Sequence, residues 1–353
     1  MLTIFTTPKA FRGHINVIQR NALKSWTRLA GRRDEKAAGL KPAATGAEIE
    51  VIVFGDEEGA AEVCREMGLR HEASVERSAS GTKYVRSIFG RAQEIARHDV
   101  VAYVNCDIVL TEDFARGVMQ VVGTFGAQGA SKQEGETRNS KLEKRKNTNI
   151  NTEVTEKQRT QRSHRENKFL MVGRRWDTEI TAPIDFSASD WAERTRALAL
   201  EQNHQQSQDW IDYFVFPRGL YREIPPLVIG RVGWDNWLVW KARSEGVPVV
   251  DATDCVVAIH QNHDYGYHPQ GKQGVWQDEE AQRNYELAGG VRHIYTMDDA
   301  THRLTERGVV TNPGYRLAPA RRALRRGRTA AWHAILGVTR PVRHALGLRK
   351  SGS

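Results

Sequence analysis

A short acidic turn follows an apolar run in the first third of the sequence. Residues 100–104 (VVAYV) lead into Asn105, Cys106 and Asp107. A continuous Val-rich run is typical of a strand buried on both faces, as in a parallel sheet. A carboxylate there is costly unless a cation or hydrogen-bond donors meet it. Asp107, with Asn105 two positions earlier, therefore indicates a site for a metal such as Mg²⁺ or Mn²⁺, or for phosphate. A cap on the next helix is an equally good interpretation of Asp107 from this stretch alone.

Two histidines end a later apolar run, where His260 and His263 stand beside Asp264. Imidazole together with carboxylate would complete an octahedral site for a borderline metal such as Mn²⁺. The alternative is a loop with two surface histidines, which is the favoured interpretation for either histidine taken alone.

A third candidate is Asp235, which follows Trp234 in a segment that leads into a predicted helix. Asp235 could cap that helix. It could also act as a general base, beside an aromatic wall that raises its pKa. The nearby aromatic residues suit stacking on sugar faces, although such a density is also ordinary in a core: Trp234, Trp237, Trp240 and Tyr213.

The neighbouring residues Arg174 and Arg175 are candidates for phosphate binding, because guanidinium groups hold phosphate in a fork geometry. Each arginine taken singly is more typical of a protein surface.

The elements that would position these residues alternate between strands and helices. The pattern predicts strands at 2–6, 48–54 and 100–104, with helices at 15–26, 60–67 and 84–97 between them. This order predicts an α/β fold around a mostly parallel sheet. Ligands of such sheets bind at the carboxyl ends of strands, where Thr6, Asp56 and Asp107 all fall.

Composition bounds the class of protein. Its 353 residues are 39% hydrophobic and 27% charged, and no window approaches the ~20 apolar residues of a membrane span. The start lacks the features of a signal peptide, and Cys64, Cys106 and Cys255 have no metal-type spacing. We therefore expect reduced thiols and a cytoplasmic location.

Two segments depart from this average. Residues 131–168 are crowded with polar and charged side chains, which predicts a disordered insertion. Residues 301–353 are predicted to be a basic tail, partly helical or disordered, and they hold much of the net charge of +9. The tail makes an anionic membrane surface, such as the inner membrane face, a candidate partner.

Longer strings resemble the nucleotide-diphosphosugar transferase superfamily with the GT-A fold, over roughly residues 2–287. The closest strings resemble glycosyltransferase-like proteins: FTTPK at 5–9, VFGDEEG at 53–59, FLMVGRRWD at 169–177, GWDNW at 233–237 and IHQNHDY at 259–265. The resemblance implies one GT-A domain over residues 1–300.

The resemblance also implies roles for individual residues. The family's metal-binding Asp-x-Asp motif matches Asn105 and Asp107, so Asp107 would be the principal ligand of Mn²⁺ or Mg²⁺. Either His260 or His263 matches a later ligand, and Asp235 matches the catalytic base of inverting members. Further residues are expected to bind the nucleotide sugar: Thr6, Asp56, Asn105, Arg174, Arg175 and Trp234.

The leading hypothesis is a metal-assisted glycosyltransferase that moves a sugar from a nucleoside-diphosphate sugar to a hydroxyl acceptor. A GT-A-like protein that binds a nucleotide sugar or carbohydrate without transfer is the alternative, because Asn105 replaces a carboxylate. A nucleic-acid or membrane-surface protein ranks third, because it uses only the tail.

Overall fold

The computed structural model describes residues 2–29, 48–126, 168–264, 275–324 and 327. Apart from Lys168, the predicted insertion lies outside the described residues, as does most of the predicted tail. The chain divides into two compact units after Asn312. In the second unit, Pro313–Leu317 form a short 3-10 helix, η3. The fold and the site below belong to the first unit.

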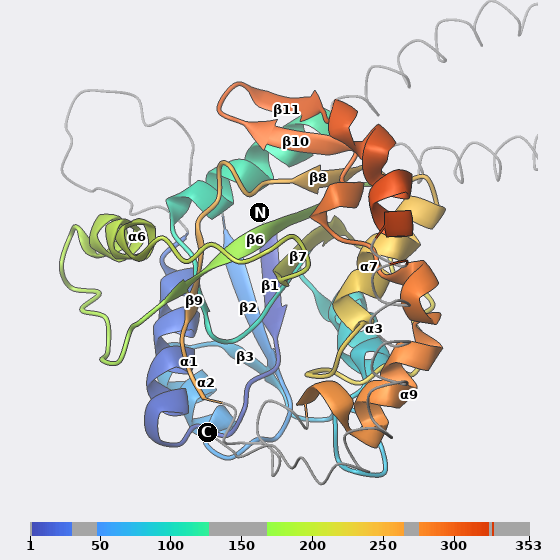
Figure 1. Cartoon of the computed structure of the whole chain (residues 1–353). Helices are drawn as coiled ribbons and strands as arrows, with labels where there is room; N and C mark the ends of the chain where they lie inside the picture. The colour runs from blue at the N-terminus through green and yellow to red at the C-terminus, as the bar shows by residue number, and fades with distance from the viewer. Residues whose placement is uncertain (1, 30–47, 127–167, 265–274, 325–326, 328–353) are drawn as a thin grey trace, which may run out of the picture. The chain divides into compact units, whose positions relative to one another are not determined.

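A large sheet forms the centre of the first unit (Figure 1). Its main path has the order β11-β10-β8-β6-β7-β4-β1-β2-β3. Strand β7 is antiparallel to both of its neighbours and β11 is antiparallel to β10, while the other neighbours on this path are parallel. The strands of this path are β1 (Leu2–Thr6), β2 (Ile49–Phe54), β3 (Arg70–Glu72), β4 (Val100–Val104), β6 (Leu170–Thr178), β7 (Ile211–Pro217), β8 (Val249–Asp251), β10 (His302–Thr305) and β11 (Gly308–Thr311). The predicted α/β class with a mostly parallel sheet is confirmed.

Two short strands lie off this path and matter most for the site. Strand β9 (Ala258–Gln261) pairs in parallel with the second half of β6 and antiparallel with β5 (Ile108–Val109). The register places Ile108 opposite His260. Asp107, which directly precedes β5, is thereby brought to the end of β9.

Helices cover both faces of the sheet (Figure 1). Two apolar cores follow from this arrangement, one containing residues of α1, α2 and the helix at 112–126, the other containing residues of α3 and α7. The helices are α1 (Gly13–Thr27), α2 (Ala60–Met67), α3 (Val85–Ile95), α6 (Trp191–Gln202), α7 (Trp234–Ser244) and α9 (Glu279–Leu287), with 3-10 turns η1 (Gly290–His293) and η2 (Met297–Asp299).

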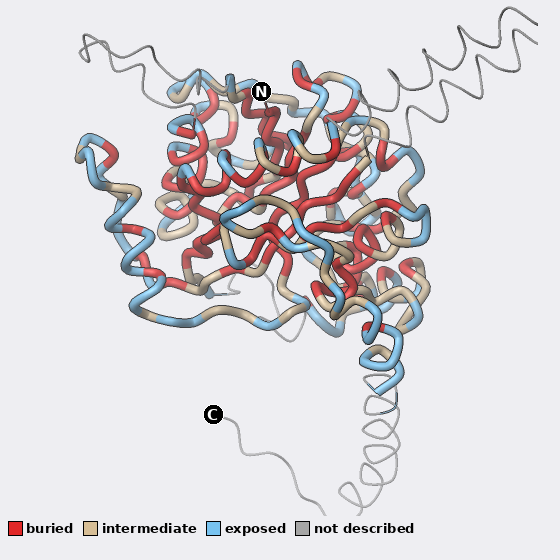
Figure 2. The backbone as a smooth tube through the Cα atoms, turned by 90° about the horizontal axis from the view of Figure 1, so that it is seen from above, coloured by how far each residue is buried: buried red, intermediate tan, exposed pale blue. Residues whose placement is uncertain are grey.

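Strand alternation explains why the central strands read as continuous apolar runs. In β1, Leu2 and Ile4 belong to the first core, whereas Phe5 belongs to the second. Successive side chains point to opposite faces, so a strand covered on both faces needs apolar residues at every position. Buried residues accordingly follow the strands through the centre of Figure 2.

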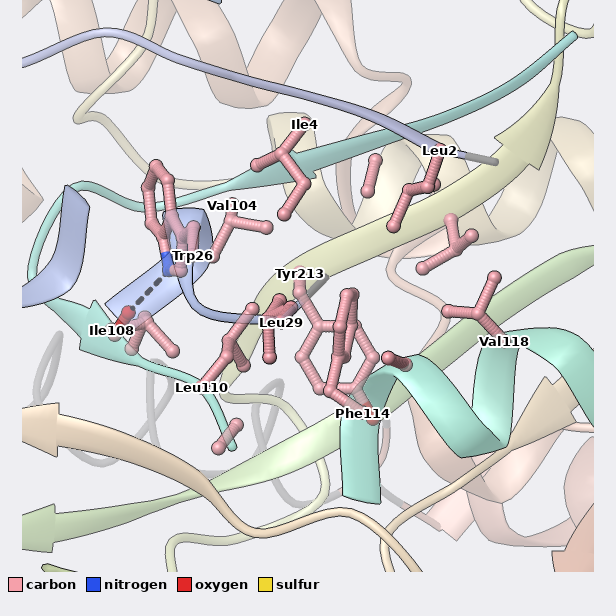
Figure 3. Close-up of a cluster of buried hydrophobic side chains, with 14 of the residues drawn as sticks. Leu2, Ile4, Trp26, Leu29, Val104, Ile108, Leu110, Phe114, Val118 and Tyr213 are labelled. Carbon is pink, nitrogen blue, oxygen red and sulfur yellow. Dashed lines mark hydrogen bonds between the residues drawn. The ribbon is translucent and has the colours of Figure 1, made fainter. Parts of the chain in front are cut away.

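The first core also fixes the turn that contains Asp107. Trp26 of α1 is fully buried, and its indole Nε1 donates a hydrogen bond of 2.9 Å to the carbonyl oxygen of Ile108 (Figure 3). This bond anchors the start of β5 against α1.

The sheet continues beyond residue 300, where the sequence placed the end of the domain. Strands β10 and β11 add a hairpin next to β8, and Leu304 is fully buried in the first core. Each of these strands has only four residues, which leaves too short a pattern to detect in the sequence.

Candidate active site

A pocket of about 970 Å³ opens at the carboxyl ends of the central strands. Thr7, Glu57 and Asp107 line it just after β1, β2 and β4. Further lining comes from the segment before α3, the start of β7, the segment that leads into α7, the first turn of α9, and the end of β9 with the residues after it. This is the edge at which parallel sheets bind their ligands.

Asp107, His260 and His263 lie together in this pocket. Their ligand atoms lie within 4.8 Å of one another, although Asp107 and the histidines are more than 150 positions apart in sequence. The Oδ2 atom of Asp107 is 3.2 Å from Nε2 of His263 and 3.9 Å from Nε2 of His260. The structure thus brings together the three residues predicted as metal ligands.

The second nitrogen of each imidazole faces an oxygen. Nδ1 of His263 is 2.6 Å from the carbonyl oxygen of Asp264, and Nδ1 of His260 is 3.2 Å from Oδ1 of Asp177. Without a cation, an N–H at Nε2 of His263 would donate to Asp107. With a cation bound, a proton on Nδ1 would leave Nε2 of each imidazole available to the cation, an arrangement typical of histidine metal ligands.

The Oδ1 atom of Asp107 is buried and has no hydrogen-bond partner among the described residues. One carboxylate and two imidazoles form a donor set that suits a borderline cation such as Mn²⁺. The residues therefore fit a divalent metal, and the orphaned carboxylate oxygen is a natural ligand for it.

Positive and hydrogen-bonding neighbours control the acidity of Asp107. Burial by itself would raise the pKa of this carboxyl, but His263, His260 and Lys9 together hold the pKa well below its usual range. The Nζ atom of Lys9 is 3.2 Å from Nε2 of His263. Asp107 is consequently an ionised carboxylate at neutral pH.

Asn105 has a different environment from Asp107, although both line the pocket. Its side-chain oxygen accepts a 2.9 Å hydrogen bond from the hydroxyl of Tyr103, and its amide nitrogen donates to Asp212. The second oxygen of Asp212 accepts a bond of 3.1 Å from Arg175. Protein groups therefore hold both the oxygen and the nitrogen of the Asn105 amide.

Arg175 and Arg174 face different surroundings. Arg175 lines the pocket, and its guanidinium also binds Asp177 at 2.8 Å. Arg174 does not line the pocket; its guanidinium donates to the carbonyl oxygen of Gln206 at 3.5 Å. Of the predicted arginine pair, only Arg175 therefore lines the pocket.

Asp235 lies in the first turn of α7, after Gly233, which caps the helix with φ of 93°. It lines the pocket, and its Oδ1 accepts a 2.8 Å hydrogen bond from the backbone N–H of Asn236. Burial raises the pKa of Asp235 to about 7, with a further contribution from the Asp212 carboxylate, against the lowering effect of that N–H. A pKa in this range suits a group that accepts and releases a proton at neutral pH.

The aromatic residues near Asp235 belong mainly to the core. Trp234 is 6% exposed and packs against Tyr103 and Phe214, with ring centroids 5.4 and 5.6 Å apart. Trp237 and Tyr213 are also buried. Of the two interpretations of these aromatic residues, the structure favours core packing, although Trp234 also lines the pocket.

Thr6 and Asp56 are near the pocket in sequence but do not line it. Thr6 is fully buried in the sheet, and Asp56 is exposed and paired with Arg77. Their neighbours Thr7 and Glu57 line the pocket instead. The pocket therefore lies beside the two strand ends, but Thr6 and Asp56 themselves do not contribute to its lining.

Sequence reasoning missed several charged groups of the pocket. Lys83 is buried, with Nζ 2.6 Å from Oε1 of Glu57 and 3.0 Å from the carbonyl oxygen of Pro8. Burial lowers the pKa of Lys83, although Glu57 opposes this effect. Lys9 ends the FTTPK string at 5–9, but the sequence around Lys9 or Lys83 does not indicate which residues either lysine contacts. Asp177 and Asp212, which link the histidine and asparagine to Arg175, were missed for the same reason.

Comparisons with known proteins add only a distant likeness. No protein-family model and no curated protein matches the sequence. Residues of the chain superpose on S. aureus TarS 1-349 in complex with UDP-GlcNAc, with a TM-score of 0.43 and 10% identity, over 83% of this chain and 65% of that one. Another TarS 1-349 structure is covered over 58% of its length.

The chain also superposes on M. tuberculosis glucosyl-3-phosphoglycerate synthase in complex with Mn²⁺, UDP-glucose and phosphoglyceric acid. This match has a TM-score of 0.41 and 11% identity, over 82% of this chain and 80% of that one. Scores of this size decide neither family nor activity, so function has to be argued from the side chains of the pocket. No helix among the described residues is both long and apolar enough to cross a membrane.

Proposed function

We propose that the protein is a GT-A-type glycosyltransferase that uses a divalent cation to transfer a sugar from a nucleoside diphosphate to a hydroxyl acceptor. The observation behind this proposal is the presence, in one pocket, of the Asp107–His260–His263 cluster and of Asp235 with a pKa of about 7. A cation site next to a carboxyl that titrates at neutral pH supplies the two requirements of such a transfer.

The donor occupies the end of the pocket formed by β1, β2 and β4 in this proposal. Asp107, His260 and His263 would hold Mn²⁺ or Mg²⁺, which when bound neutralises charge on the diphosphate leaving group. Lys9 adds a positive charge beside the cluster. Thr7, just after β1, and Lys83, just before α3, line the part of the pocket where the nucleoside would be bound.

The acceptor lies on the α7 side of the pocket. The Asp235 carboxylate accepts the proton from the attacking hydroxyl oxygen, which makes that oxygen a better nucleophile as the bond to the donor sugar forms. Burial of Asp235 at the start of α7 raises the pKa of its carboxyl to about 7, a value that suits a general base at neutral pH.

Nucleotide-sugar binding without transfer is the second candidate function. It is favoured by Asn105, whose amide is held by Tyr103 and Asp212 and adds no negative charge to the cluster. Binding would then need only Asp107 and the two histidines, and Asp235 would serve the start of α7.

Titration with Mn²⁺ and a panel of UDP- and GDP-sugars separates these functions. A donor that binds the folded state raises thermal stability by mass action, by about 2.7 kcal/mol at a concentration of 100 times Kd. Stabilisation with release of the nucleotide supports transfer or donor hydrolysis, whereas stabilisation without release supports binding alone. No response to any donor would contradict both functions.

A further inference from the structure

Two tryptophans that the proposed mechanism does not use face each other in the pocket. Trp210 and Trp276 both line it, with ring centroids 5.7 Å apart and planes inclined by 60°. Trp276 is 44% exposed, whereas the other tryptophans of the described chain are half-buried or buried. A large exposed indole inside a pocket is unusual for packing and typical of a surface that receives a ligand.

Trp210 also contacts a fixed arginine. The guanidinium carbon of Arg175 lies 4.5 Å from the centre of the Trp210 ring, within the range of a cation–π contact. Arg175 is itself fixed by ion pairs of 2.8 Å to Asp177 and 3.1 Å to Asp212. The ring is therefore oriented before any ligand arrives, which lowers the entropic cost of stacking on it.

Carboxylates surround this aromatic pair. Asp209 precedes Trp210, and Asp278 and Glu279 follow Trp276, and all three line the pocket. The nearby guanidinium of Arg231 is already matched by Asp278 at 2.8 Å and Glu280 at 3.2 Å. Ionised carboxylates accept hydrogen bonds from hydroxyl groups and repel phosphate. The local chemistry suits a ligand with an apolar face, many hydroxyls and no negative charge.

The pair also lies on the side of the pocket where Asp235 is found. Asp209 and Asp212, which flank Trp210, both contribute to the electrostatic environment of the Asp235 carboxyl. A ring stacked on the tryptophans is thus placed on the Asp235 side of the pocket.

We propose that Trp210 and Trp276 form an acceptor subsite that stacks a pyranose ring of a neutral or amino-sugar-containing glycan. The role of this subsite as an acceptor site rests on the proposed transferase function. The recognition of a sugar ring rests on the aromatic and acidic side chains that line the subsite. The donor's nucleobase is the competing occupant, and it is disfavoured here because it would bring its diphosphate toward Asp209 and Glu279.

The test compares wild-type full-length protein with two variants on an array of immobilised neutral, amino, phosphorylated and carboxylated glycans. Trp276→Ala should weaken binding to the preferred neutral or amino glycans about tenfold, and Trp276→Phe should weaken it less, since a smaller ring remains. Met119→Ala is the matched control, because Met119 is also 44% exposed and does not line the pocket. This variant should bind like the wild type.

Three results would overturn the subsite. They are a lack of glycan binding by the wild type, unchanged binding by Trp276→Ala, and a preference for phosphorylated or carboxylated glycans. A parallel titration with UDP and GDP tests the competing occupant. If Trp276→Ala loses nucleotide affinity and keeps glycan binding, the indole of Trp276 stacks on the nucleobase and not on a sugar. The donor panel described above is independent, so glycan binding without any donor response would refute the transferase and not the sugar-binding surface.

Discussion

Asp107 and Asp235 line the same pocket and are both shielded from water, yet their carboxyl groups differ in acidity. For both, burial is the largest influence on the pKa and acts to raise it. At Asp107 two imidazoles and Lys9 reverse that effect, whereas at Asp235 the Asp212 carboxylate reinforces it. Charged neighbours, and not burial, therefore decide which carboxyl is ionised at neutral pH.

This difference divides the pocket into two chemical regions. The strand-end region around Asp107 offers a permanent negative charge that a cation can use. The region at the start of α7 offers a carboxyl poised between its two protonation states. Pairs of titratable groups whose environments separate their pKa values are typical of sites that assign acid, base and charge-stabilising roles to different residues.

The largest expected effect comes from Asp235→Asn. This change keeps the shape of the side chain but removes its ability to accept a proton, so transfer should fall by roughly 10²- to 10⁴-fold. Donor affinity should stay the same, because the strand-end region is untouched. Steady-state transfer together with donor titration checks both quantities. Asp190→Asn, at the start of α6, is the control; transfer that survives in Asp235→Asn would make Asp235 a helix-end residue only.

Asp107→Asn should have the next largest effect and should act on the other region. Removal of the carboxylate charge should weaken Mn²⁺ affinity by about 100-fold, since the second-shell losses known for metal sites already reach that size. Calorimetric titration with Mn²⁺ measures this directly, without any need for a substrate. Unchanged Mn²⁺ affinity would show that Asp107 does not bind the cation. The two aspartates would then no longer have the different roles proposed for them.

A smaller effect is expected from Asp177→Asn, which keeps all three proposed ligands. Oδ1 of Asp177 is 3.2 Å from Nδ1 of His260, so its charge helps to orient the ring and to increase its basicity. The variant should lose about tenfold in Mn²⁺ affinity, at the lower end of the range for second-shell changes. A loss of overall stability with no change in Mn²⁺ affinity would limit Asp177 to supporting Arg175.

The smallest effect concerns stability and tests the sign of the Asp235 shift. The folded-state pKa of about 7 exceeds the unfolded value of about 3.9, so the folded state holds this proton more tightly. The stability it provides is complete below the unfolded pKa and is lost as the pH rises through 7. Asn mimics the neutral form, so the stability of Asp235→Asn relative to the wild type should grow from pH 6 to pH 7, by about 1 kcal/mol.

Urea unfolding of both proteins at the two pH values measures this difference. If the difference in unfolding free energy between the wild type and Asp235→Asn is the same at both pH values, Asp235 has an ordinary pKa. The two aspartates would then not differ in acidity.

The sequence was informative about strands and weak about the orientation of side chains. Apolar periodicity located β1, β2 and β4, because these strands are buried on both faces and need apolar residues throughout. Thr7 and Glu57 line the pocket where Thr6 and Asp56 were expected, because Thr6 is buried within β1 and Asp56 lies exposed in the turn after β2, paired with Arg77. Arg174, next to Arg175 on β6, likewise does not line the pocket.

Long-range partners were the second gap. Asp107 and the two histidines could be named as ligand candidates because each follows an apolar run, but the acidity of Asp107 depends on Lys9, far away in the chain. The exposed Trp276 could not be told from buried Trp234 by residue type, since exposure depends on what the fold places around each ring. Local patterns predict elements, whereas charge balance and exposure arise only after packing.

The distance along the chain between Asp107 and His263 has a consequence for how the protein is made. The carboxylate emerges from the ribosome 156 residues before the imidazole that accompanies it. Gln261, between the two histidines, hydrogen-bonds through its side chain to the carbonyl oxygen of Ile18 at 2.8 Å, across 243 positions. Contacts of this separation close late in folding, because chain entropy opposes them until most of the sheet exists. The nascent chain therefore carries Asp107 without its histidine partners during the synthesis of 156 residues, and the proposed cation site can form only after β9 has been made.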